Sequence, residues 1–162
     1  MDILDIKPNK RKAIFFAKRQ LSEFVYDAVN LEGIHYTLPE VQTLLDGVTV
    51  GGHKQSDQKI TLNQAEAWHF LFDALEKNTF NVSKEFVCQL HKKATEDEAL
   101  EWGCFRSGGV TIVGSDYRPP VAASLDENWD QMCKELSRID NIYDRAIYSF
   151  LQMARNQFFY DV

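Results

Sequence analysis

At 162 residues, with 44% hydrophobic residues including 11 Phe, 6 Tyr and 3 Trp, the chain can bury the core of one domain, which excludes global disorder. Its net charge of −6 argues against nucleic-acid and membrane partners, because both attract proteins with a basic surface. The three scattered cysteines lack disulfide-framework or C-x-x-C spacing, which indicates a reduced, cytoplasmic setting.

A long first helix is predicted between Asn9 and Gly33. Apolar residues recur there three or four positions apart, which is the period of a helix with one buried face, at Ile14, Ala17, Leu21, Phe24, Val25 and Ala28. The basic residues Lys10-Arg11-Lys12 and Lys18-Arg19 form either a solvated helix face or a local basic patch. Glu32 lies at the unfavourable, negative end of the helix dipole. It is either a tolerated surface charge or the partner of an arginine.

Capping signals divide the middle of the chain. Thr37-Leu-Pro-Glu40 is a capping box with proline in the first turn, which predicts a short helix. The glycine-containing stretch 46–60 is predicted to be a loop, and Thr61-Leu-Asn-Gln64 a second capping box that opens the next helix. Ser83 is the predicted N-cap of a further helix.

Segment 103–120 is the one long stretch without helical spacing. Four glycines interrupt it and Pro119-Pro120 end it. Val110-Thr-Ile-Val113 is a β-branched run typical of a strand. We therefore expect a small β-hairpin, or an extended flap, lying against the helices. Its edge could pair with a visiting peptide by strand addition.

Two further helices complete the prediction. A capping box at Ser124-Leu-Asp-Glu127 opens one of them, and Asn141 precedes the other. In the last helix the apolar residues have the spacing of a central, well-covered helix, at Ile142, Ala146, Phe150 and Met153. The resulting fold class is all-α with one β-hairpin, and these patterns alone define no function.

Three separated stretches together resemble the Fic (Fido) family, in the class with an N-terminal inhibitory helix. They are Leu31-Glu-Gly-Ile-His-Tyr-Thr-Leu-Pro-Glu-Val41, then Leu90-His91 with Gly103-Cys-Phe-Arg106, Val110-Thr-Ile112 and Tyr117-Arg-Pro-Pro120, and finally Gln157-Phe-Phe-Tyr-Asp161. The last is similar to the opening of the family signature His-x-Phe-x-(Asp/Glu)-Gly-Asn. The resemblance implies one domain over 1–162, with the inhibitory helix region at 9–33, a partial Fic core at 34–162 and a flap at 103–120.

Proteins of this family typically transfer AMP from ATP to a hydroxyl of a target protein. By resemblance, ATP and Mg²⁺ are the expected cofactors and a protein is the expected partner. Phe159 belongs to the signature, Asp161 is the expected Mg²⁺ ligand, and Glu32-Gly33 is the inhibitory motif. The flap residues expected to hold the target are Arg106, Gly108, Gly109, Val110, Thr111 and Ile112.

The chain departs from the family at the general base, where Gln157 stands in place of histidine. An amide cannot accept and release a proton near neutral pH, which typically removes ~10²–10⁴-fold of rate. Val162 occupies the first glycine position of the phosphate loop, and the rest of that loop is missing. We expect a truncated or degenerate Fic protein that transfers AMP weakly or not at all. Gln157→His alone is not expected to restore transfer.

Two alternatives remain open. A regulatory or peptide-binding module on a degenerate Fic scaffold would recognise a peptide along Gly108–Gly114 without chemistry. A helical interaction domain would resemble the family by accident. Nucleotide binding in the micromolar range would count against the module.

Overall fold

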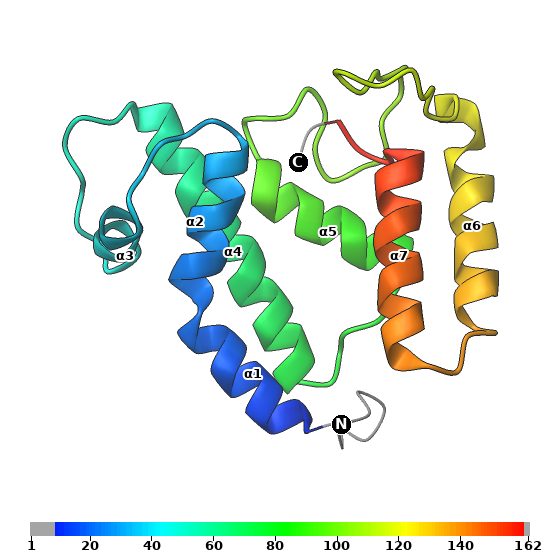
Figure 1. The fold of residues 1–162 in the computed structure, drawn as a ribbon, viewed down its shortest axis with the longest axis horizontal. Coiled ribbons are helices and arrows are strands. Elements are labelled where there is room, and N and C mark those ends of the chain that lie inside the picture. The colour runs from blue at the N-terminus through cyan, green and yellow to red at the C-terminus, as the bar shows by residue number, and fades with distance from the viewer. Residues whose placement is uncertain (1–8, 161–162) are drawn as a thin grey trace. The chain divides into compact units, whose positions relative to one another are not determined.

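The computed structural model describes residues 9–160, and all the regular secondary structure in that part of the chain is helical (Figure 1). The predicted all-α class is confirmed. Internal contacts divide the chain into two compact units, with the boundary between Phe80 and Asn81. Between residues 9 and 160, none of the helices has the length and apolar character needed to cross a bilayer.

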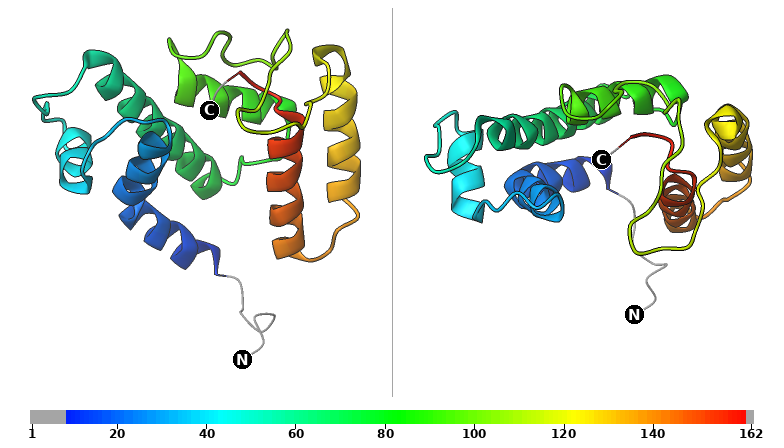
Figure 2. Two further views of the ribbon diagram at one scale, coloured as in Figure 1. Left: turned by 45° about the horizontal axis from the view of Figure 1, so that its top comes forward. Right: turned by 90° about the horizontal axis from the view of Figure 1, so that it is seen from above.

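The first unit contains four α-helices, of which α1 and α2 follow one another along α4 (Figures 1 and 2). They are α1 (Lys10–Arg19), α2 (Leu21–Leu31), α3 (Leu38–Leu45) and α4 (Gln55–Glu76). The predicted long first helix is therefore broken. Gln20, at φ −99° and ψ 8°, ends α1 and begins α2. Its N–H still bonds the carbonyl oxygens of Phe16 and Ala17, so the break is a local bend.

Local capping fixes α3 as predicted, but α4 begins earlier than predicted. Glu40 Oε2 accepts hydrogen bonds from the N–H and hydroxyl of Thr37, both at 2.7 Å. Thr61 does not open a helix, because α4 already runs from Gln55. The Thr61 hydroxyl instead donates to the carbonyl oxygen of Asp57, one turn earlier, at 2.7 Å. A threonine can satisfy its hydroxyl in this way inside a helix, so the capping-box pattern was misleading.

The core of the first unit forms between α2, α3 and α4. Val25, Val29 and Val41 are fully buried there. Tyr36 joins them from the α2–α3 connection, and its ring stacks on His53 with centroids 3.7 Å apart.

The second unit consists of α5 (Lys84–Thr95), a 3₁₀ turn η2 (Ala122–Ser124), α6 (Leu125–Leu136) and α7 (Ile142–Asn156). Helices α6 and α7 lie antiparallel and side by side (Figures 1 and 2). The predicted cap at Ser83 is present, because its hydroxyl accepts from Phe86 N–H at 3.1 Å. The capping box predicted at Ser124 is not formed, because the Ser124 hydroxyl makes no cap bond and donates to the carbonyl oxygen of Val121 at 2.9 Å. Asn141 caps α7, with its Oδ1 accepting from Tyr143 N–H at 2.8 Å.

The core of the second unit combines α6 with the segment that follows α7. Leu125, Trp129, Met132 and Leu136 of α6 are buried with Phe158. The Phe158 ring meets the Trp129 ring edge-to-face at 5.4 Å. Phe158 is therefore the anchor that ties the end of the described chain to α6.

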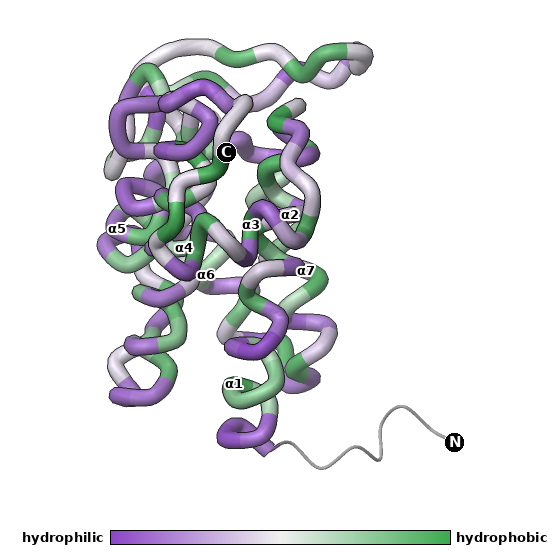
Figure 3. The backbone as a smooth tube through the Cα atoms, turned by 90° about the vertical axis from the view of Figure 1, so that its left-hand side faces the viewer, coloured by the Kyte–Doolittle hydropathy of each residue, from purple (hydrophilic) through white to green (hydrophobic). Residues whose placement is uncertain are grey.

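The prediction that α7 is a central, well-covered helix is wrong. Phe150 is 72% exposed and Ile142 is 62% exposed. Hydrophobic and hydrophilic residues alternate along this helix (Figure 3). Helical periodicity identifies an apolar face but does not say what covers it. In this unit the fully buried core residues come from α6 and Phe158, and α7 adds the partly buried Tyr148 and Met153.

Candidate functional site at the end of α7

The predicted β-hairpin at 103–120 is not formed. Residues 9–160 contain no strand, and segment 103–120 is a loop of bends with one turn at Val113–Gly114. The turn is closed by a bond from Ser115 N–H to the carbonyl oxygen of Ile112 at 3.2 Å. Bonds from side chains to the main chain, rather than a ladder between strands, determine the course of this loop.

Arg106 is the residue that fixes the loop. Its side chain is buried, with the residue 2% exposed. Nε donates to the carbonyl oxygen of Gln157 at 2.5 Å, and Nη1 to that of Gly108 at 2.5 Å. Nη2 donates to the carbonyl oxygens of Pro120 at 2.6 Å and Asn156 at 3.2 Å. One guanidinium thus joins both sides of the loop to the C-terminal end of α7.

Two opposing electrostatic effects act on this clamp, the attraction of the helix end for a cation and the cost of burying the charged guanidinium. The last carbonyl groups of a helix lack partners within the helix and carry its negative dipole end, so a buried cation is stabilised there. Burial lowers the pKa of Arg106, and the nearby Tyr160 acts in the opposite direction. Arg106 was predicted to contact a target protein directly. Because its side chain is buried, we assign it the role of shaping the loop instead.

His91 of α5 forms a second attachment. Its Nδ1 accepts a hydrogen bond from Gly103 N–H at 3.2 Å, at the start of the loop. The neutral ring therefore carries its proton on Nε2, and Nε2 lies 3.3 Å from the carbonyl oxygen of Tyr160. The imidazole also stacks on the Phe159 ring, with centroids 4.2 Å apart. His91 thus connects α5, the loop and the C-terminal segment.

Gly108 lies close to the Tyr160 side chain, which would have to shift to admit a larger residue. A Cβ atom on Gly108 would lie 2.4 Å from the Tyr160 hydroxyl, well inside normal contact. At Gly109 a Cβ would meet nothing within 4 Å. The sequence suggested only flexible glycines here, and the structure distinguishes a packing glycine from one at an open position.

Gln157 ends α7 in the left-handed conformation, at φ 47° and ψ 61°. Its N–H bonds the carbonyl oxygen of Met153 at 3.0 Å. Its side-chain Nε2 donates to the carbonyl oxygen of Ala154 at 2.8 Å. Both bonds fold Gln157 back onto the last turn of the helix, so this residue is a C-cap of a kind usually made by glycine or asparagine.

A groove of about 830 Å³ lies between the loop and the end of α7. It brings together the predicted residues Gly109, Val110, Thr111, Gln157 and Phe159. Its other lining residues come from α7 and the C-terminal segment, and they are Phe150, Met153, Ala154, Phe158 and Tyr160. The loop predicted to hold a target and two of the signature positions therefore share one surface.

The remaining predicted residues lie elsewhere. Arg106, Gly108 and Ile112 do not line the groove. Asp161, the predicted Mg²⁺ ligand, lies outside the described residues. Glu32 and Gly33 end α2 in the first unit, where Gly33 has φ 76°.

Sequence reasoning missed Tyr160 and Asn156, and it assigned no role to His91. Of these three residues, only His91 belonged to a motif that could have indicated its role, the Leu90-His91 pair that resembles the Fic family. Tyr160 could not have been selected, because its role depends on the distant Gly108 and His91. Asn156 is buried at the end of α7, where its side chain accepts a bond from Asn128 at 2.9 Å.

The described lining of the groove is uncharged. Across residues 9–160, no three or more His, Cys, Asp and Glu side chains gather where they could hold a metal ion. The described lining of this groove therefore contains no carboxylate for Mg²⁺ and no cation for a triphosphate.

Comparison with known proteins identifies the fold. No family model matches the chain, and no curated protein matches it in sequence. Among solved structures, a Fic family protein from Desulfovibrio desulfuricans G20 superposes with a TM-score of 0.76 at 17% identity over 90% of this chain. Fic-1 from C. elegans gives 0.68 at 20% over 87%. A Fic domain containing signaling protein from Bacteroides thetaiotaomicron VPI-5482 gives 0.69 at 17% over 98%.

The chain therefore has a Fic-like fold. It spans 44%, 43% and 62% of those three chains, in the same order. At these identities the likeness concerns the fold, and fold alone does not define an activity.

Proposed function

We propose that this chain is a Fic-type protein whose groove at the end of α7 receives a segment of a target protein, and that it transfers AMP to that target weakly or not at all. The observation that carries the proposal is the position of Gln157. It lines the groove beside Val110 and Thr111, and by resemblance it occupies the place of the general base. Its carboxamide does not titrate near neutral pH, and its nitrogen is engaged with Ala154.

The loop is suited to holding a peptide. Among the described residues, no backbone hydrogen bond joins Gly109–Thr111 to another segment. An extended peptide could therefore pair with these main-chain groups, a mode of recognition that tolerates many side chains. Arg106 supports this binding indirectly, because it holds both ends of the loop.

ATP, Mg²⁺ and inhibition by Glu32 enter the proposal through the family resemblance. ATP would supply the AMP group, and Mg²⁺ with Asp161 would neutralise its phosphates. The described lining of the groove offers neither group a charged partner. What this chain's own residues contribute is the position of the peptide and the lack of a titrating base at Gln157.

The proposal is tested by incubating the chain with labelled ATP, Mg²⁺ and cell lysate, alongside the Glu32→Gly variant. We expect faint label on target proteins, stronger with Glu32→Gly. Ala154→Trp, which fills the groove, should abolish this label. Arg145→Trp is the matched control, because Arg145 is exposed on the same helix and does not line the groove. Robust transfer by the unmodified chain would contradict the role given to Gln157.

The second candidate is a peptide-binding module without nucleotide chemistry, which the uncharged lining favours. Titration calorimetry with ATP·Mg²⁺ separates the two functions. Binding in the micromolar range would support the Fic-type enzyme. If ATP·Mg²⁺ gives no heat of binding and the lysate shows no label, the result would support the peptide-binding module.

A further inference from the structure

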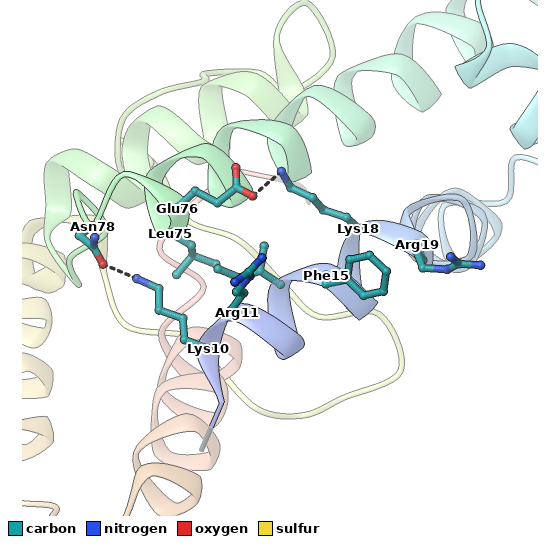
Figure 4. A pocket seen from close by; sticks show the side chains of 9 residues that line it. Lys10, Arg11, Phe15, Lys18, Arg19, Leu75, Glu76 and Asn78 are labelled. Atoms are coloured by element: carbon teal, nitrogen blue, oxygen red, sulfur yellow. Dashed lines mark hydrogen bonds and ion pairs between the residues drawn. The ribbon is translucent and has the colours of Figure 1, made fainter. Parts of the chain in front are cut away.

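A second groove lies within the first unit, between α1 and the last turn of α4 (Figure 4). Its volume is about 680 Å³. Ile14, Phe15 and Leu75 provide its apolar surface, and Phe15 is 56% exposed. Exposed aromatic surface in a concave site is unfavourable in water and gains free energy when a partner covers it.

The rim of this groove is cationic. Lys10, Arg11, Lys18 and Arg19 line it, and Glu76 is its one described carboxylate. Lys18 Nζ bonds Glu76 Oε1 at 2.8 Å, so that pair is internally neutralised (Figure 4).

The other rim cations keep their charge available. Lys10 Nζ donates to Asn78 Oδ1 at 2.6 Å, and this partner is neutral (Figure 4). The Arg19 guanidinium lies 5.8 Å from the Phe15 ring centroid, and within residues 9–160 it has no anionic partner. Three rim cations thus remain uncompensated among the described residues, although the whole chain has a net charge of −6.

We propose that this groove binds an acidic amphipathic peptide segment of another protein, with apolar side chains on Phe15 and Leu75 and carboxylates on the rim. The charge complementarity selects acidic side chains, and the apolar floor selects helix-in-groove binding. A bilayer surface is disfavoured, since it cannot enter a groove between two helices. This site is separate from the groove at the end of α7, so the two proposals fail or succeed independently.

Neighbouring residues of α1 provide matched controls. Arg11 and Phe15 line the groove, whereas Lys12 and Phe16 are exposed on the same helix and do not. Lys12 has the same charge as Arg11, and Phe16 is 60% exposed, close to Phe15. Any effect of helix propensity, net charge or general hydrophobicity should therefore be shared by each pair, and only groove binding should separate them.

The experiment measures fluorescence anisotropy of a labelled peptide about 15 residues long, with leucines at helical spacing and glutamates between them. We expect saturable binding that weakens between about 50 and about 300 mM salt. Arg11→Glu should weaken it by about tenfold and Lys12→Glu by less than about twofold. Phe15→Ala should weaken it and Phe16→Ala should not. A lysine-for-glutamate version of the peptide should not bind.

Three results would overturn the proposal. Equal losses for Arg11→Glu and Lys12→Glu would indicate diffuse charge attraction. The second result is that the peptide does not bind but vesicles containing phosphatidylserine do, and that Arg11→Glu weakens vesicle binding more than Lys12→Glu does. This result would indicate that the groove recognises a lipid surface. Asp2 and Asp5 precede α1 in the sequence. Peptide binding seen only after both are changed to Asn would assign the groove to the chain's own N-terminal residues.

Discussion

The Arg106 guanidinium donates to the main-chain carbonyl oxygen of Gln157, a residue 51 positions away in the sequence. That oxygen lies at the left-handed residue that ends α7, where the helix dipole favours a cation. Because the same guanidinium also holds Gly108 and Pro120, the loop and the C-terminal segment form one structure. The floor of the candidate site therefore depends on a residue that a ligand would not touch.

Arg106→Met should destabilise the second unit by about 3 kcal/mol, because methionine fills similar apolar volume but removes the donors of four buried or partly buried carbonyl oxygens. Urea denaturation measures the loss, and amide hydrogen exchange at Phe158 should speed up with it. Arg118→Met is the control, since Arg118 is exposed in the same loop, and it should change stability by no more than about 0.5 kcal/mol. Equal effects of the two substitutions would mean that the clamp contributes nothing specific.

Gly108→Ala should loosen the segment that carries Phe159 and Tyr160, because the new methyl group would lie 2.4 Å from the Tyr160 hydroxyl. We expect a cost of about 1–2 kcal/mol, the range for overpacking. Gly109→Ala should be neutral, since its Cβ meets open space. Adding Tyr160→Phe to Gly108→Ala should recover part of the loss in a double-mutant cycle. Full additivity of the two changes would contradict the contact.

Glu40 should give the first unit part of its acid sensitivity. Hydrogen bonds from the Thr37 backbone and then its side chain lower the pKa of Glu40 below its ordinary value. A carboxyl group with a depressed folded-state pKa stabilises the fold above its unfolded pKa, and this contribution disappears as pH falls through the folded value. Glu40→Gln should therefore flatten the acid limb of stability against pH below about pH 4.5. Asp27→Asn, at an exposed helical position, should leave that limb unchanged.

Cys104 should be alkylated before the other two cysteines. Burial raises the pKa of the Cys88 and Cys133 thiols, so both hold less of the reactive thiolate at pH 8. Cys104 is exposed in the loop, whereas the others are half-buried. Iodoacetamide labelling followed by peptide mass spectrometry gives the order. Faster labelling at Cys88 than at Cys104 would show that the loop opens away from α5 in solution.

Local rules predicted the features that depend on neighbouring residues. The cap at Ser83 and the Thr37–Glu40 box join residues three positions apart, so their chemistry is visible in a short window of sequence. The helical class follows for the same reason. The Thr61 error shows the limit of such windows, because a cap and a threonine inside a helix use the same hydroxyl.

Long-range contacts decided what those rules could not. His91 reaches Tyr160 across 69 positions, and Arg106 replaces the expected strand ladder with bonds to scattered carbonyl groups. The helical pattern also could not predict which residues pack over α7, and Phe150 remains largely exposed. Periodicity predicts which segments are helical and which of their faces are apolar. Only folding brings distant donors, acceptors and rings within contact distance, and those contacts made the candidate site.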